Sequence, residues 1–218
     1  DAEPVDGPDL AEVAALAAAR QEVLDRIESA CARAARPPGA AQLVAVSKTV
    51  PVERLRLALR AGHERLGENR VQEAAAKVEQ LDAVEWHLVG HRQSNKAARA
   101  IALFDVIESV DSLDLAARLD RLAEATGSAR AHPSAGALSI YLQVNVDDDP
   151  AKSGFEVADL ERQLDGILGL PHLDVRGLMT VGWLTTGGPL ARGTFARRER
   201  PCRTPEPPSR RVLPDRAS

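Results

Sequence analysis

The chain has 218 residues, of which 44% are hydrophobic, 28% are charged and 3% are aromatic. This length gives one large domain or two small ones, with enough apolar surface for a substantial core. The formal net charge of −4 at pH 7 provides no electrostatic basis for binding nucleic acid or an anionic membrane. No apolar run in the sequence approaches the length of a membrane span.

The N-terminal stretch DAEPVDGPDLAEV is acidic and lacks the basic and then apolar segments of a signal peptide. The two cysteines, Cys31 and Cys202, lie far apart and do not have the spacing of metal ligands. We therefore expect a cytoplasmic protein with incidental thiols and no metal site.

Strand-like and helical patterns alternate along the chain. A long helix is expected over about 9–35, where apolar residues recur at helical spacing, and RPPGA ends it. Strand patterns follow at LVAVS, ERLGEN, EWHLVG, FDVIESV, ALSIYLQVNV and HLDVRGLMTV. Helical patterns separate these strands. Gly62 is expected to end the first of these helices, and Ser112 to cap the start of another.

Six strands separated by helices predict a parallel sheet with right-handed crossovers. An open doubly wound sheet and a (β/α)8 barrel both have this pattern. No G-x-G-x-x-G follows the first strand, which counts weakly against a dinucleotide-binding fold. Polar residues cluster where the strands end, which is where a barrel carries its active site. In the fifth strand, Tyr141 and Asn145 share a face that is expected to point into a polar barrel mouth.

Lys48 ends the first strand pattern with no acidic residue beside it. One interpretation is a surface lysine whose stem lies along apolar neighbours. The other is a partly desolvated amine in the barrel mouth, where the neutral form is favoured and attacks aldehydes. The position alone leaves both interpretations open.

Six motifs occur in order along the chain: LVAVSKT, RLGENRVQEAAAK, WHLVGHRQSNKA, SVDS, QVNVDDDPAKSGF and VRGLMT. Together they closely resemble the pyridoxal phosphate homeostasis protein family, which is similar in fold to the barrel domain of alanine racemase. The likeness covers about 10–180. It implies an α/β fold, a (β/α)8 TIM-type barrel with an extra N-terminal helix.

The resemblance implies a protein that binds pyridoxal 5′-phosphate (PLP) and serves intracellular PLP homeostasis without robust catalysis or a catalytic residue. PLP would be held as a Schiff base on Lys48. The other residues that the resemblance places around the cofactor are Asn69, His87, Gly90, Asn145, Lys152 and Met179. The implied partners are PLP and apo-PLP enzymes that receive it, with no nucleic acid and no membrane. We expect a monomer or a weak dimer.

Several of these residues also have structural interpretations. Asn69 suits a helix cap, and His87 suits a satisfied buried histidine. Glu68 suits a general base or, better, a carboxylate at a helix start. Lys152 follows DDDP, so local charge pairing is expected. The single tyrosine, Tyr141, lies in mid-strand and is poorly placed as a racemase base, which favours binding over catalysis.

The sequence departs from the family pattern after Gly182. Residues 183–218 hold eight arginines, three acidic residues and six prolines, and show neither helical nor strand periodicity. The Ser-x-Gly-Met-Ser and V-R-I-G motifs, which hold the cofactor phosphate in the family, do not occur. We expect a barrel domain over 9–182 that is incomplete after about six strands, and a tail over 183–218 that is disordered or translated out of frame. A PLP-dependent racemase-like enzyme and a defective barrel that does not bind PLP are the alternatives.

Overall fold

The computed structural model describes residues 7–90, 96–126 and 136–182. Its helices are α1 (Gly7–Arg33), α2 (Val52–Arg60), α3 (Val71–Val78), α4 (Ala97–Leu103), α5 (Leu113–Thr126) and α6 (Val157–Leu168). Its strands are β1 (Ala45–Val46), β2 (Arg65–Glu68), β3 (Glu85–Leu88), β4 (Val106–Val110), β5 (Leu138–Gln143) and β6 (Leu173–Met179). The tail predicted over 183–218 lies outside the described residues.

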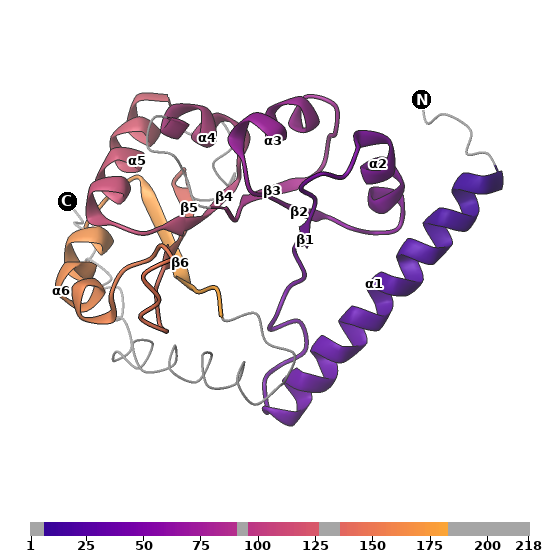
Figure 1. The fold of residues 1–218 in the computed structure, drawn as a ribbon, viewed down its shortest axis with the longest axis horizontal. Coiled ribbons are helices and arrows are strands. Elements are labelled where there is room, and N and C mark those ends of the chain that lie inside the picture. Colours follow the sequence, from indigo (N-terminus) through magenta and orange to yellow (C-terminus); the bar gives the residue numbers. More distant parts are fainter. Residues whose placement is uncertain (1–6, 91–95, 127–135, 183–218) are drawn as a thin grey trace, which may run out of the picture.

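The six strands form one parallel sheet in the consecutive order β1-β2-β3-β4-β5-β6. A doubly wound sheet instead reverses direction after its first strands and places later strands on the other side. Figure 1 shows the sheet curving, with α2 to α6 along its outer side and the long α1 standing apart at one end. The barrel-type architecture with an extra N-terminal helix is therefore confirmed. No pairing between β6 and β1 occurs among the residues that the structure describes.

The main core lies between the outer face of the sheet and the helices. Strand β3 illustrates why, because successive side chains of a strand point to opposite faces. Trp86 and Leu88 alternate with Glu85 and His87, and both apolar side chains are fully buried. The largest side chains packed in this layer are Trp86, Phe104, Leu66, Leu88, Ile101, Ile107, Leu119, Leu138, Ile140, Leu142 and Ile167.

The predicted helix ends are confirmed in two places. The Ser112 hydroxyl accepts a hydrogen bond from the Leu115 amide at 3.2 Å, as an N-cap does. Gly62 has a φ of 88° and donates its amide to the Leu59 carbonyl, and glycine is the residue that adopts this left-handed conformation most readily. The capping role proposed for Asn69 is wrong, because Arg70 occupies the N-cap position of α3 and no side chain caps that end.

Helix α1 contacts the rest of the molecule chiefly through α2 (Figure 1). Arg54 pairs with Glu12 at 2.9 Å, and Arg20 lies near Gly62 at the end of α2. Within the described part of the chain, no helix is long and apolar enough to cross a membrane.

His63, which follows α2, provides a pH-dependent probe of the contact between α1 and α2. Burial lowers the pKa of His63 below 6.5, and the charge of Arg20 lowers it further. The folded state therefore binds this proton less readily than the unfolded state, so the contribution to stability is present above pH 6.5 and is lost as the pH falls. We expect Arg20→Gln to raise the pKa of His63 in an NMR titration while leaving it below 6.5. An unchanged pKa would show that Arg20 does not act on His63.

Candidate functional site

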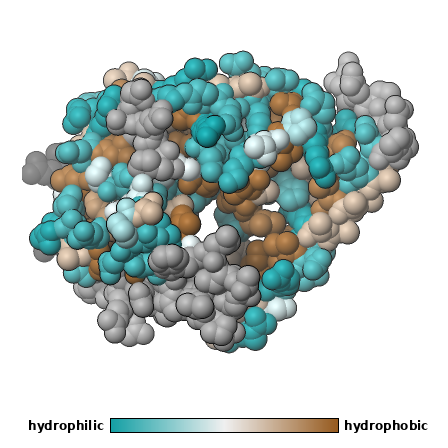
Figure 2. Space-filling model, in the orientation of Figure 1, coloured by the Kyte–Doolittle hydropathy of each residue, from teal (hydrophilic) through white to brown (hydrophobic). Residues whose placement is uncertain are grey.

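The inner face of the sheet borders an open cleft of about 650 Å³. It is lined by Gly39, Ala40, Gln42, Val44, Val46, His87, Val89, Glu108, Tyr141, Arg176, Leu178, Met179 and Thr180. The hollow near the centre of the molecule is visible in Figure 2. Two of the predicted cofactor residues, His87 and Met179, therefore line the same cleft. Tyr141 lines it as well, so the inward orientation predicted for this side chain is confirmed.

His87 is a satisfied buried histidine, as one interpretation of the sequence predicted. Its side chain lies between two carboxylates: Nδ1 is 2.7 Å from Glu108 Oε1, and Nε2 is 3.2 Å from Glu85 Oε1. Glu85 is also paired with Arg65, whose Nε lies 2.8 Å from Oε2. Because both ring nitrogens already face acceptors, this histidine is held in place on the inner face of the sheet.

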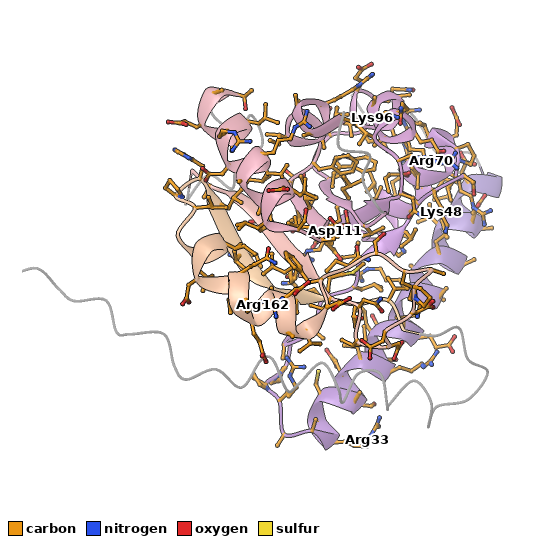
Figure 3. The ribbon with its side chains drawn as sticks, turned by 60° about the vertical axis from the view of Figure 1, so that its left-hand side comes forward. Arg33, Lys48, Arg70, Lys96, Asp111 and Arg162 are labelled. Carbon is orange, nitrogen blue, oxygen red and sulfur yellow. The ribbon has the colours of Figure 1, made fainter. Side chains whose placement is uncertain are left out.

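Lys48 lies in a tight turn between β1 and α2 (Figure 3). The Val50 amide donates to the Ser47 carbonyl at 3.1 Å, which closes a β-turn over residues 47–50. Thr49 has a φ of 65°, whereas the φ of Lys48 is negative, and this is the pattern of a type II turn. The prediction of a partly desolvated amine is wrong, because Lys48 is exposed.

A buried ion pair lies behind this turn. Glu68 has no exposed surface, and its Oε1 accepts hydrogen bonds from Lys77 Nζ and from Ser47 Oγ, both at 2.7 Å. Lys77 Nζ also donates to the Ser47 carbonyl at 2.8 Å. Glu68 thus has a role that neither sequence interpretation included.

Lys77 was not among the predicted site residues, although the sequence carries a signal of its burial. The apolar face of α3 contains Val71, Ala74 and Val78, and Lys77 lies three residues after Ala74 on that face. A lysine on the buried side of a helix needs a partner, since a buried ammonium group is costly when unpaired. The nearest upstream carboxylate that ends a strand is Glu68.

The loops after β2 and β3 touch backbone to backbone. A Cβ atom placed on Gly90 would lie 2.3 Å from the Asn69 carbonyl oxygen and 2.5 Å from its Cα. No side chain fits at this contact, so the close approach requires glycine. Two residues implied by the family resemblance are therefore in direct contact.

We expect Gly90→Ala to lower the free energy of unfolding by about 1–3 kcal/mol, because the two loops must separate. Gly166→Ala is the matched control: Gly166 lies within α6, and its nearest neighbour would be a Leu113 side-chain atom at 3.9 Å. That variant is expected to gain about 0.5–1 kcal/mol from helix propensity. Denaturant unfolding of both variants measures the difference, and equal stabilities would contradict the contact.

Asn145 and Lys152 belong to the loop that follows β5. The Asn145 side chain exchanges two hydrogen bonds with the Asp149 backbone, and Lys152 Nζ lies 3.4 Å from Asp147 and 3.8 Å from Asp149. The local charge pairing expected for Lys152 is confirmed. Neither residue lines the cleft, and their contact with a cofactor stays a prediction.

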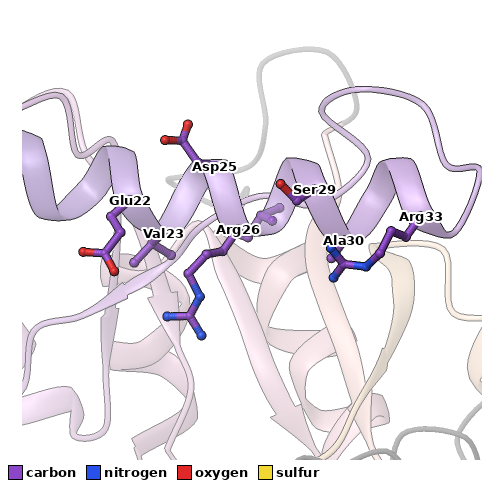
Figure 4. Close-up of a pocket in the computed structure, with 8 residues that line it drawn as sticks. Glu22, Val23, Asp25, Arg26, Ser29, Ala30 and Arg33 are labelled. Atoms are coloured by element: carbon purple, nitrogen blue, oxygen red, sulfur yellow. The ribbon is translucent and has the colours of Figure 1, made fainter.

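A second depression, of about 690 Å³, runs along α1. Figure 4 shows that Glu22, Arg26 and Arg33 project from one side of this helix, whereas Asp25 projects from the other. All of its lining residues come from a single helix, so it lacks the converging groups of a binding site. Among the described residues, no group of three or more histidine, cysteine, aspartate or glutamate side chains is arranged to hold a metal ion.

Comparison with known proteins agrees with this architecture. The family described as alanine racemase, N-terminal domain, matches residues 20–185. The pyridoxal phosphate homeostasis protein of Escherichia coli (strain K12) is 35% identical over 167 residues, which cover 73% of this chain and 67% of that protein. The chain belongs to the pyridoxal phosphate homeostasis protein family.

Solved structures extend this comparison. PipY of Synechococcus elongatus, solved with PLP bound, superposes with a TM-score of 0.66 at 36% identity and covers 82% of this chain and 79% of that one. An alanine racemase of Clostridium difficile superposes with a TM-score of 0.59 at 13% identity, covering 73% of this chain and 42% of that one. The second likeness concerns the fold alone. The family match over residues 20–185 spans all six described strands.

Proposed function

We propose that this chain binds PLP, holds it as a Schiff base on Lys48, and serves PLP homeostasis without robust catalysis. The observation that carries the proposal is an exposed primary amine, held in a defined turn where β1 ends. Support also comes from the homeostasis-family relatives and from the PipY structure with PLP bound. In this step the Lys48 nitrogen adds to the aldehyde carbon, and the carbonyl oxygen leaves as water.

Three other residues implied by the family resemblance lie at or just after the ends of β2, β3 and β6. The Asn69–Gly90 contact holds the loops after β2 and β3 together, so these two residues implied by the family resemblance are adjacent. Met179 provides an adaptable apolar surface on the cleft wall. In this proposal PLP supplies the electrophilic carbonyl, and the protein supplies the amine and the apolar wall.

Two residues of the cleft, His87 and Tyr141, favour PLP binding over catalytic turnover. Racemisation needs an acid/base group on each face of the substrate carbon. His87 is occupied by Glu85 and Glu108, and Tyr141 lies in the middle of β5. Measurement of alanine racemisation by the purified protein with PLP tests this directly, and we expect no sustained turnover. A racemisation rate above that of free PLP alone would support the racemase-like alternative.

The chain has only four lysines, at positions 48, 77, 96 and 152, so the attachment site can be mapped completely. We expect added PLP to give an absorbance band that borohydride abolishes, with the reduced adduct on Lys48 by mass spectrometry. Lys48→Ala should lose the band, and Lys96→Ala is the matched control that should retain it. A folded, wild-type sample without the band would contradict the proposal and favour the defective-barrel alternative.

The proposed homeostatic role includes transfer of PLP to apo-PLP enzymes. An apo-enzyme should regain activity faster with the PLP-loaded protein than with the same concentration of free PLP in the presence of a competing aldehyde scavenger. Equal rates would limit this chain to storage of the cofactor.

A further inference from the structure

Ser47, the residue that precedes Lys48, is hydrogen-bonded to three buried residues. Lys77 Nζ donates to the Ser47 carbonyl at 2.8 Å, and the Ser47 hydroxyl donates to Glu68 Oε1 at 2.7 Å. The Ser47 amide donates to the Gly67 carbonyl at 2.8 Å. Ser47 is itself buried, whereas the next residue, Lys48, is exposed. The backbone is therefore fixed at Ser47, directly before the lysine that is proposed to react.

The turn that holds Lys48 does not have the residues that this turn prefers. A type II turn places its third residue at positive φ, where glycine or asparagine is favoured. Here the third residue is Thr49, whose branched Cβ is disfavoured at its φ of 65°. Such a conformation persists when the surrounding structure holds it.

The Glu68–Lys77 pair is the group placed to hold it. A buried ion pair is seldom required for stability, because apolar residues of similar volume pack as well or better. This pair adds something that apolar residues cannot, namely a charged donor to the Ser47 carbonyl. That carbonyl is also the acceptor that closes the turn with the Val50 amide.

We propose that Glu68 and Lys77 are positioning residues that hold the 47–50 turn and thereby set the placement of the Lys48 amine. The inference rests on the proposed attachment of PLP to Lys48. Glu68 orients the Lys77 ammonium group and the Ser47 hydroxyl through a single oxygen, and Lys77 fixes the Ser47 carbonyl. Neither residue contacts the reacting atoms in this proposal.

The test uses the double variant Glu68→Leu with Lys77→Met, which removes the Glu68–Lys77 ion pair without leaving a buried charge. Its thermal melt should remain cooperative and close to that of the wild type. Without PLP, the Val50 amide should exchange with deuterium at least about tenfold faster, the size of a lost hydrogen bond to a charged group. With PLP, borohydride-trapped attachment at Lys48 should slow by a similar factor. Arg70→Met, which breaks an exposed pair beside α3, should change neither rate.

Adding Thr49→Gly to the double variant should restore the turn without the ion pair. Such a rescue is not expected if Glu68 and Lys77 serve only the stability of the fold. Glycine adopts the required φ without strain, so Val50 protection and Lys48 attachment should recover together. If the double variant exchanges and attaches as the wild type does, the proposal is wrong. If the wild type attaches no PLP, the proposed function fails instead, and Val50 exchange still decides whether the pair holds the turn.

Discussion

Lys77→Met alone is expected to lower the free energy of unfolding by about 3–5 kcal/mol, because it leaves a buried carboxylate without its partner. Glu68 is fully buried, and the described residues offer its Oε2 no hydrogen-bond partner. Chemical denaturation monitored by circular dichroism measures the loss.

The matched control for that variant is Arg70→Met. Arg70 pairs with Glu73 at 3.1 Å, but 74% of its side chain is exposed. Exposed pairs contribute about 0.2–1 kcal/mol, so the control should lose little stability. Similar losses in both variants would show that the Glu68 carboxylate is not confined to a buried environment.

Trp86→Ala is expected to lower the free energy of unfolding by about 3–5 kcal/mol, through lost burial and the cavity left behind. Trp86 has no exposed surface, and its side chain packs between the sheet and the helices. Leu168→Ala, at a side chain that is 57% exposed, should stay within about 0.5 kcal/mol of the wild type. Equilibrium unfolding of the three proteins provides the comparison.

Trp86→Phe separates packing from polarity at the same position. The indole Nε1 is buried and has no hydrogen-bond partner among the described groups. Phenylalanine therefore gives up volume but no hydrogen bond, and the expected cost is about 1 kcal/mol. A loss as large as that of Trp86→Ala would show that Nε1 makes a bond that the structure does not contain.

The alternation of strands and helices was predictable because each element has its own periodicity. Trp86 and Leu88 alternate with polar residues as a half-buried strand does, and Ser112 provides a local N-cap signal. The choice between a barrel and a doubly wound sheet needed the strand order, which the sequence pattern leaves open.

The site was less predictable because it depends on contacts between distant residues. The run LVAVS predicted a strand, but β1 contains only Ala45–Val46, and Ser47 begins the turn that holds Lys48. Glu68 was expected near a helix start and is instead buried against α3. Helical spacing places Lys77 on a buried face, yet only the fold identifies its partner.

The hydrogen bonds that Ser47 makes with Glu68 and Lys77 also bear on the order in which parts of the chain can fold. The most distant of these residues, Ser47 and Lys77, are 30 residues apart in the chain, and consecutive strand order makes each strand pair with its sequence neighbours. Contacts confined to neighbouring elements do not wait for strands later in the chain, and during synthesis the N-terminal elements fold first. Every residue of this support lies between β1 and the end of α3, so the support requires no residue of β4, β5 or β6.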